Sequence, residues 1–314
     1  MSDIFFEQLK LKKPDYNLNI NTLSHGAMTG RMLEKIEERI QFCNPDCVLV
    51  YGDTNSTLAG ALAAKKLHRK IAHIEAGLRS FNMKMPEEIN RILTDRMSDF
   101  LFCPTDTAVK NLKSEGFENF ESIIFRTGDV MKDSALFFSQ FSKKPSIELP
   151  YKFIVCTLHR EENTNDINNL TEIFNSFEKI SKEIPIILPI HPRTQNIIKK
   201  FGIGYENILN LHIIEPLGYL EMLYLLKNCS LVMTDSGGLQ KEAYFFDKPA
   251  VVLREETEWI EITKAGANIL AGSDKNRIYA AFQEMIDKKI IQDQTLFGNG
   301  NASSEIVNHL LQNL

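Results

Sequence analysis

The sequence predicts an α/β protein of two parallel-sheet domains that face one another across a cleft. A chain of 314 residues is long enough for two domains of ordinary size. Short runs that are apolar on both faces alternate with helical patterns, which is typical of parallel sheets covered by helices on both sides. The pattern stops at a polar stretch over residues 142–150 and then restarts. We therefore expect one domain over residues 1–145 and a second over residues 146–314, whose last helix packs back toward the first.

The first domain is expected to alternate strands with helices, but to begin in an unusual way. Residues 1–45 hold no strong strand run and end in one long helical pattern from about Ala27 to Phe42. The first sheet is therefore expected to lack its opening strand and helix. The expected strands cover residues 47–51, 70–74, 100–103 and 122–125, and the expected helices residues 56–67, 86–97 and 105–115.

The second domain repeats the pattern without interruption. Its sheet is expected to bind a ligand at the carboxyl ends of the strands, as open parallel sheets do. The expected strands cover residues 151–157, 184–190, 209–214, 230–234, 250–253 and 268–271. The expected helices cover residues 166–182, 193–200, 219–227, 238–245 and 274–287, and residues 303–314 form a final amphipathic helix.

Composition and charge exclude several classes of protein. The net charge is −5 with both signs spread along the chain, so nothing indicates a nucleic-acid partner. No apolar run approaches the roughly 20 residues that span a bilayer, and the first residues do not resemble a secretory signal. The five cysteines are scattered without zinc-site spacing. We expect a cytoplasmic protein without disulfides, membrane partner or metal site.

An anion-binding turn is predicted where the apolar run over residues 229–233 leads into a helical pattern. The turn contains Ser236, Gly237 and Gly238, and its backbone N–H groups would point out of the start of the helix, where the helix dipole favours an anion. Glu242 lies further along the same helix, where its carboxylate could accept hydrogen bonds from a sugar hydroxyl pair. The pattern predicts a cradle for a nucleotide diphosphate, and the alternative is an ordinary helix N-cap.

Acidic side chains follow expected strands of the first domain. Asp53 and Glu75 each come directly after a strand, so both would lie at one edge of the sheet. Glu87 stands in the first turn of a helix and shares a helix face with Arg91. Each has a structural alternative: Asp53 could cap a helix, Glu75 could pair with Arg79, and Glu87 could serve the helix dipole.

Cationic side chains follow expected strands of the second domain. His159 and Arg160 come after its first strand and His191 after its second, where they suit neutralising a leaving diphosphate. A lone histidine is more often structural, but one at each of two strand ends favours function. Arg254 begins a polar segment that carries the single tryptophan and would line the same rim.

The two sets of residues together indicate acid–base chemistry on a nucleotide sugar. The second domain offers groups that bind anions, and the first offers carboxylates that can exchange a proton with carbon. The chain has no GxxxxGK[ST], metal-ligand cluster or GxSxG, so a P-loop enzyme, a metalloenzyme and an esterase are poorly supported.

Seven segments of the chain occur in the order and spacing of a known family. They are GDTNSTLAGALAA, HIEAGLRS, MPEEINR, GDVMKD, LHREEN, PIHPR and TDSGGLQKEA. The set resembles the bacterial non-hydrolysing UDP-N-acetylglucosamine 2-epimerases over nearly the whole chain. The resemblance implies two Rossmann-like domains, as in the B-type glycosyltransferases. It also implies interconversion of UDP-GlcNAc and UDP-ManNAc through elimination of UDP to 2-acetamidoglucal and its re-addition.

The resemblance also assigns roles to residues and implies no metal, nicotinamide or other cofactor. Matching motif positions imply that Asp53, Glu75 and Glu87 act as catalytic acids and bases, and that His159 assists departure and return of the diphosphate. The residues expected to hold UDP are His191, Ser236, Gly237 and Glu242, and those expected to contact the substrate besides are Arg79, Arg91, Arg160, Gly238 and Arg254.

Two departures from the family pattern widen the range of functions to consider. The family begins with a strand and a Gly-Thr-Arg-Pro-Glu loop that nothing here matches, so we expect a less stable and less active chain than a longer form. Thr257-Glu258-Trp259 stands where many members have Thr-Glu-Arg-Pro, which admits a related substrate such as UDP-2,3-diacetamido glucuronate. A same-fold alternative is a UDP-sugar glycosyltransferase, which would not require three carboxylates in the first domain. A further alternative is a nucleotide-sugar binding protein that lost its activity with the missing loop. The expected partners are a UDP-sugar and a second copy of the chain in a homodimer.

Overall fold

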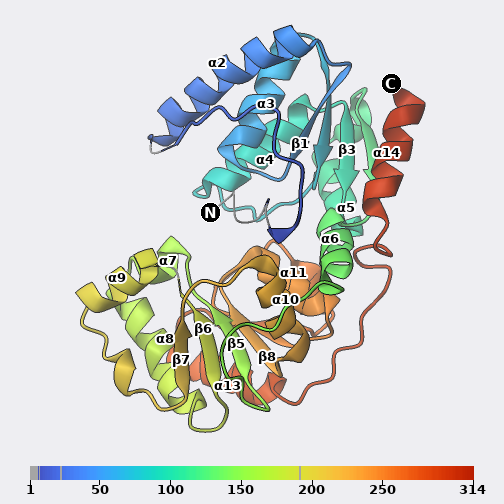
Figure 1. Ribbon diagram of the computed structural model, residues 1–314. Coiled ribbons are helices and arrows are strands. Elements are labelled where there is room, and N and C mark those ends of the chain that lie inside the picture. Colours follow the sequence, from blue (N-terminus) through green and yellow to red (C-terminus); the bar gives the residue numbers. More distant parts are fainter. Residues whose placement is uncertain (1–5, 7, 22, 191) are drawn as a thin grey trace. The chain divides into compact units, whose positions relative to one another are not determined.

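The structure is a computed structural model that describes residues 6, 8–21, 23–190 and 192–314. The chain forms two compact units (Figure 1). We call residues 13–133 with 294–314 the N-terminal domain, and residues 1–12 with 134–293 the C-terminal domain.

The division of the chain differs from the expected boundary at residues 145 and 146. It falls inside helix α6 (Val130–Ser139), and the C-terminal tail with helix α14 (Ala302–Asn313) groups with the N-terminal domain. The reason is apolar packing, because Ile306 on α14 lies in one buried cluster with Ala72 and Phe102 of the N-terminal sheet.

The N-terminal domain is a four-stranded parallel sheet whose strands follow chain order, β1-β2-β3-β4. Each strand expected from the sequence is confirmed. The described residues before Cys47 contain no strand, and β1 lies at the edge of the sheet with Leu49 and Tyr51 exposed. The strands are β1 (Cys47–Tyr51), β2 (Lys70–Ile74), β3 (Phe100–Cys103) and β4 (Ile123–Arg126).

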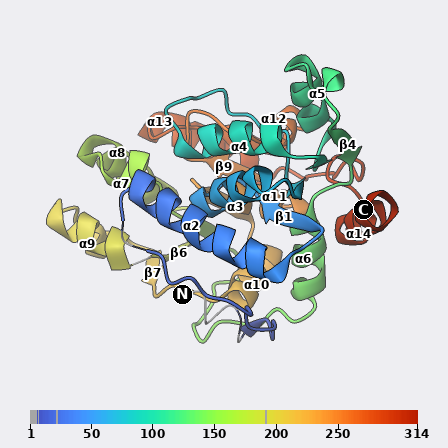
Figure 2. The ribbon, with the colours of Figure 1, turned by 90° about the horizontal axis from the view of Figure 1, so that it is seen from above.

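Three helices of this domain lie side by side in Figure 2: α2 (His25–Cys43), α3 (Asn55–Lys66) and α4 (Pro86–Met97). Helix α3 buries a row of small side chains, of which Ala61 and Ala64 pack with Ile71 of the sheet. Helix α4 differs, because all of its buried residues are polar or charged. The domain also contains helix α5 (Asp106–Ser114) and the 3-10 turn η1 (Phe117–Asn119).

The C-terminal domain is a six-stranded parallel sheet in the order β10-β9-β8-β5-β6-β7. Each expected strand is again confirmed. The strands are β5 (Ile154–Thr157), β6 (Ile186–Pro189), β7 (Leu211–Ile214), β8 (Leu231–Thr234), β9 (Ala250–Val252) and β10 (Asn268–Leu270). The helices are α7 (Glu161–Thr164), α8 (Ile167–Ile180), α9 (Pro192–Lys200), α10 (Tyr219–Asn228), α11 (Gly237–Phe245), α12 (Ile260–Lys264) and α13 (Lys275–Met285), with the 3-10 turn η2 (Tyr205–Asn207).

Apolar side chains of the C-terminal sheet form a core on each face. Along β5, Ile154 and Cys156 lie in one buried cluster and Val155 in another, because successive residues of a strand point to opposite faces. The cysteines are free, and no helix of the described residues is long and apolar enough to cross a membrane.

Candidate functional site

The C-terminal sheet has a switch point between β5 and β8, where the order of its strands reverses. The chain runs from β5 outward through β6 and β7 on one side, and from β8 through β9 and β10 on the other. Ligands of open parallel sheets bind outside the carboxyl ends of the strands at such a point. The segments that leave the sheet there are residues 158–163 and 235–238, which include most of the groups expected to hold a diphosphate.

Asp235 organises this end of the sheet. Its fully buried carboxylate accepts the backbone N–H groups of His159 (3.0 Å) and Arg160 (2.9 Å) and the side-chain amide of Asn163 (3.3 Å). Asn163 also donates to the carbonyl oxygen of Leu253 at 2.9 Å. The ends of β5, β8 and β9 are thereby held together by one carboxylate, which was not among the expected site residues.

Ser236 caps helix α11 at the end of β8. Its hydroxyl oxygen accepts the N–H of Leu239 at 3.3 Å, and its own N–H donates to the hydroxyl of Thr234 at 2.9 Å. The capping alternative is therefore correct for this hydroxyl. Capping does not exclude anion binding, since the first turn of a helix presents several N–H groups, and the diphosphate cradle stays a prediction.

Glu258 places a carboxylate at the start of α11. A Cβ atom at Gly237 would collide with its oxygen, so a larger residue there would require the Glu258 side chain to move. The same carboxylate accepts from Nη1 of Arg254 at 3.0 Å, and the Arg254 side chain is almost wholly buried. Arg254 therefore lies near the cradle as expected, paired with a carboxylate that the sequence analysis did not identify. Its contact with a substrate stays a prediction.

Glu242 is buried on α11 and held by a phenol. The hydroxyl of Tyr219 donates to its Oε1 at 2.8 Å. Burial, together with the charge and hydrogen bond of Glu242, raises the pKa of Tyr219, so the phenol stays protonated and keeps donating. The carboxylate thus has a fixed orientation, as a ligand for two sugar hydroxyls requires.

We expect Glu242→Ala to weaken binding of UDP by about 1–3 kcal/mol, the usual loss for a hydrogen bond to a charged group. Isothermal calorimetry with UDP measures the change, and Glu284→Ala, an exposed position on α13 of the same domain, is the control. Unchanged affinity in a folded Glu242→Ala protein would remove Glu242 from the nucleotide site.

His159 combines exposure with a fixed orientation. Its side chain is 50% exposed, and its Nδ1 lies 3.2 Å from Oδ1 of the buried Asp235. A carboxylate at Nδ1 favours a proton on that nitrogen and leaves Nε2 for a ligand. Arg160 is half-buried at the start of α7. His191 lies outside the described residues, so its contact with UDP stays a prediction.

In the N-terminal domain, the ends of β1 and β2 bring Asp53 and Glu75 to one place. The N–H of Gly52 donates to the carbonyl of Ile74 at 3.1 Å, and a Cβ at Gly52 would lie 3.5 Å from Oε2 of Glu75. The Glu75 carboxylate therefore lies over Gly52, the residue before Asp53 in the chain. Glu75 itself has a φ of 74°, a left-handed conformation that is rare outside glycine and concentrates at functional sites.

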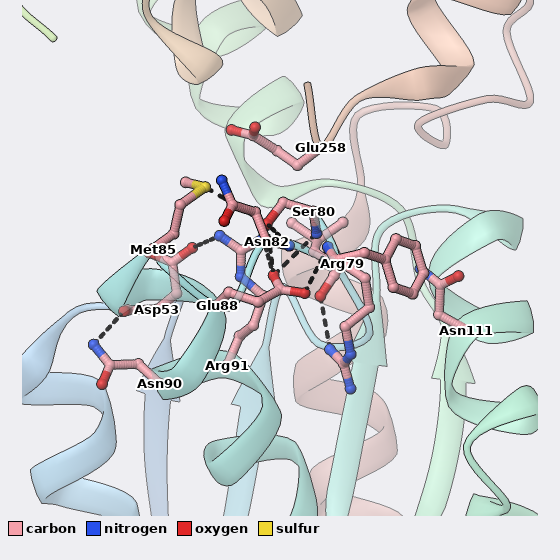
Figure 3. Close-up of polar contacts among 12 residues, drawn as sticks. Asp53, Arg79, Ser80, Asn82, Met85, Glu88, Asn90, Arg91, Asn111 and Glu258 are labelled. Carbon is pink, nitrogen blue, oxygen red and sulfur yellow. Dashed lines mark hydrogen bonds and ion pairs between the residues drawn. The ribbon is translucent and has the colours of Figure 1, made fainter. Parts of the chain in front are cut away.

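Asp53 is held by two side chains of α4, drawn in Figure 3. Nη2 of Arg91 donates to its carboxylate at 2.6 Å, and the amide of Asn90 donates to its carbonyl at 2.9 Å. The N-cap of α3 is Thr54, so the capping alternative for Asp53 is wrong. Arg91, expected to contact the substrate, is bound to Asp53, and any further contact stays a prediction.

Two neighbouring glutamates at the start of α4 have different surroundings. Glu88 is fully buried and accepts the N–H groups of Ser80 and Phe81, each at 2.9 Å, which fixes the loop before the helix (Figure 3). Glu87 is only partly buried. The partly open side chain is the better candidate for contact with a substrate, and its catalytic role stays a prediction.

A network of buried ion pairs connects α4 to β2 and to the loop that follows β2. Asp95 on α4 pairs with His73 of β2 at 2.6 Å and with Arg79 at 2.7 Å. Arg79 also forms a bidentate salt bridge with Glu115, with distances of 2.6 and 2.8 Å. The Arg79 side chain is 1% exposed. Arg79 thus pairs with Asp95 and Glu115 rather than with Glu75. These bonds favour a structural role over the expected contact with a substrate.

The pKa values of His73 and Asp95 reflect their pairing with each other. Burial alone would lower the pKa of His73, but the hydrogen bond and charge of Asp95 outweigh burial and raise it. Burial alone would raise the pKa of Asp95, but His73 and Arg79 outweigh burial and lower it. Both groups are therefore held in their charged forms inside the domain.

Asp95, Glu88 and Asp235 were not among the residues expected at the site, although the sequence held a signal for two of them. Glu88, Arg91 and Asp95 are spaced for one face of a helix, and that helix lies between two buried strands. A charged face on a helix that must pack against a sheet indicates an ionic network. Asp235 gave no comparable signal, because its position after β8 is equally typical of a turn.

Comparison with known proteins identifies similar sequences over almost the whole chain. The sequence model of the family described as UDP-N-acetylglucosamine 2-epimerase matches residues 1–311. The chain is similar to a UDP-2,3-diacetamido-2,3-dideoxy-D-glucuronate 2-epimerase of Pseudomonas aeruginosa, with 54% identity over 312 residues that cover 99% of this chain and 87% of that protein. It is similar to a UDP-N-acetylglucosamine 2-epimerase of Methanococcus maripaludis, with 48% identity over 320 residues that cover 98% and 87%.

Solved structures show the same likeness. One is the crystal structure of the Methanocaldococcus jannaschii UDP-GlcNAc 2-epimerase in complex with UDP-GlcNAc and UDP. It matches with a TM-score of 0.92 and 42% identity, over 99% of this chain and 88% of that one.

Proposed function

Because the chain belongs to the UDP-N-acetylglucosamine 2-epimerase family, we propose that it inverts C2 of UDP-N-acetylglucosamine and so interconverts this sugar nucleotide with UDP-N-acetylmannosamine. The observation that carries the proposal is the pair of acidic strand ends, Asp53 and Glu75, which lie together at one sheet edge. A carboxylate pair of this kind suits removal and return of a proton on carbon. The 48% identical relative and the UDP-GlcNAc-bound neighbour support this substrate.

The reaction divides between the two domains. A carboxylate of the N-terminal domain takes the proton from C2, the bond between C1 and the diphosphate oxygen breaks, and its electron pair leaves with UDP. The first turn of α11 and an N–H of the His159 ring stabilise the negative charge on the departing diphosphate. A second carboxylate returns a proton to the opposite face of C2, and UDP adds again at C1. Atoms and charge balance without an oxidant or cofactor.

A second candidate substrate is the UDP-2,3-diacetamido sugar acid. It is favoured by the 54% identity to an epimerase named for that substrate. The segment Thr257-Glu258-Trp259 also departs from the common family pattern. Trp259 is buried, and the ammonium of Lys241 lies 4.0 Å from the centre of its ring. A sugar acid carries a carboxylate at C6. A site that binds it therefore needs a cation near that carboxylate, which a site for UDP-N-acetylglucosamine does not need.

Incubation of the chain with each UDP-sugar in separate tubes tests the proposal. Proton NMR of the anomeric signals follows formation of the C2 epimer, and long incubation detects slow turnover. We expect UDP-N-acetylmannosamine from UDP-N-acetylglucosamine. Turnover of the diacetamido sugar acid alone would transfer the proposal to the second candidate, and turnover of neither would contradict both. Hydrolysis or transfer of the sugar without a C2 epimer would indicate a transferase.

A further inference from the structure

The buried pair of His73 and Asp95 lies behind the acidic strand ends, where neither residue can touch a substrate. Both side chains are 0% exposed. Desolvation of two charges offsets much of their attraction, so a buried ion pair is weak evidence of a stabilising role. Its position immediately behind Asp53 and Glu75 points to a different role.

Each ring nitrogen of His73 faces an acceptor. Nε2 lies 2.7 Å from the carbonyl oxygen of Gly52, which can only accept, so Nε2 carries a proton. Nδ1 lies 2.6 Å from the carboxylate of Asp95, which also accepts. The ring is therefore an imidazolium that connects α4 to the end of β1, at the residue before Asp53.

Asp95 connects the same ring to the end of β2. Its second oxygen accepts the N–H of Gly77 at 3.1 Å and Nη1 of Arg79 at 2.7 Å. Gly77 lies two residues after Glu75. One carboxylate thus reaches both strand ends, one directly and the other through His73.

The backbone at the end of β2 needs external support. Gly52, Glu75 and Gly77 have φ values of 62°, 74° and 80°, in the left-handed region that is costly for Glu75. A Cβ at Gly77 would collide with the carbonyl oxygen of Ala108. Such a backbone persists only where surrounding bonds hold it, and the bonds of His73 and Asp95 do so.

We propose that His73 is a positioning residue for Asp53 and Glu75: with Asp95 it fixes the spacing of the two strand ends and therefore of the two carboxylates. The inference rests on the proposed epimerase function. The imidazolium acts through the Gly52 carbonyl, and it makes no contact with the sugar nucleotide.

Two amide variants separate the two bonds of the ring. His73→Gln can place an N–H near the position of Nε2 and keep the bond to Gly52. His73→Asn can donate only near the position of Nδ1, so it loses the hydrogen bond to the carbonyl oxygen of Gly52. The control is Asp99→Asn, which weakens a bond of 2.8 Å to the N–H of Ile71 at the opposite end of β2.

We expect His73→Asn to lower kcat about 100-fold, the cost of a misplacement of about 1 Å, with UDP affinity unchanged. We expect His73→Gln to keep more activity, and Asp99→Asn to stay near wild type. Hydrogen exchange of residues 51–54 and 75–79 should speed up in His73→Asn but not in Asp99→Asn.

Two results would overturn the proposal: a kcat for His73→Asn no lower than that for Asp99→Asn, or His73→Gln losing as much as His73→Asn. If His73→Asn does not fold, the comparison of His73→Gln with Asp99→Asn decides the question, with intermediate loss expected. A wild-type chain without epimerisation contradicts the proposed function instead. The exchange measurement then still tests the positioning role, since unchanged exchange at the strand ends in His73→Asn contradicts it.

Discussion

Asp53→Asn is expected to lower the rate of epimerisation about 10²–10⁴-fold, the range for loss of a positioned acid or base. Asparagine keeps an oxygen for the bond from Arg91 (2.6 Å in the native protein) and keeps the carbonyl that binds Asn90. The fold should therefore survive, and UDP affinity should change little, because the cradle residues lie in the other domain. Conversion is followed by NMR and affinity by calorimetry.

Asp106→Asn is the matched control for this prediction, since it removes a carboxylate of the same domain whose side chain is 78% exposed. It should leave the rate unchanged. Near-normal proton exchange at C2 in a folded Asp53→Asn protein would give Asp53 a structural role only. Glu75→Gln and Glu87→Gln are expected to behave as Asp53→Asn does, and a variant that keeps its rate would remove that residue from the catalytic set.

Asp95→Asn is expected to destabilise the N-terminal domain by about 3–5 kcal/mol, the cost of breaking a buried ion pair by removing one partner. The substitution leaves His73 and Arg79 buried without the carboxylate that both contact. Urea unfolding followed by circular dichroism measures the change. The single tryptophan, Trp259, belongs to the C-terminal domain, so its fluorescence transition should not move. Asp99→Asn, whose side chain is 34% exposed, should cost less.

The loss from Asp95→Asn should also depend on pH in a defined direction. The pKa of His73 is raised by Asp95, so this pairing contributes fully below the unfolded value near 6.5 and fades as pH rises through the folded value. The pKa of Asp95 is lowered, so its contribution is present above about 3.9 and fades as pH falls through the folded value. The difference between wild type and variant should therefore be largest between mild acid and neutrality. A difference that grows at alkaline pH would contradict the imidazolium.

The strands could be predicted from the sequence because most are buried on both faces. Runs such as Phe100–Cys103 have no polar side to satisfy, so their apolar letters leave little choice. Among the helices that the described residues form, α6, α7 and α12 were not expected. The last two are short, so they offer too few residues for a helical period to be visible. Helix α6 does have a capping residue, because the carboxylate of Asp129 accepts the N–H of Met131 at 2.8 Å, but a single aspartate is also typical of a turn and its aromatic residues do not distinguish a helix from a loop.

The positions of candidate site residues could be predicted only where a residue directly follows a strand, and their catalytic roles stay predictions. Asp53, Glu75 and His159 follow strands, and their common edges follow from parallel topology. The residues behind them could not be found in this way. Asp95 reaches His73 across a helix-to-strand contact, and Asp235 binds backbone N–H groups of a segment far away in the chain. Such partners depend on three-dimensional packing.

The incorporation of deuterium from D₂O at C2 of UDP-N-acetylglucosamine and its epimer tests the central claim most directly. Loss of a proton to one carboxylate and return of another on the opposite face require a solvent-derived hydrogen at C2 of every epimerised molecule. We predict a single deuterium, at C2 only, in the UDP-N-acetylmannosamine that forms. An epimer that forms but keeps its original hydrogen at C2 would contradict proton transfer by Asp53 and Glu75.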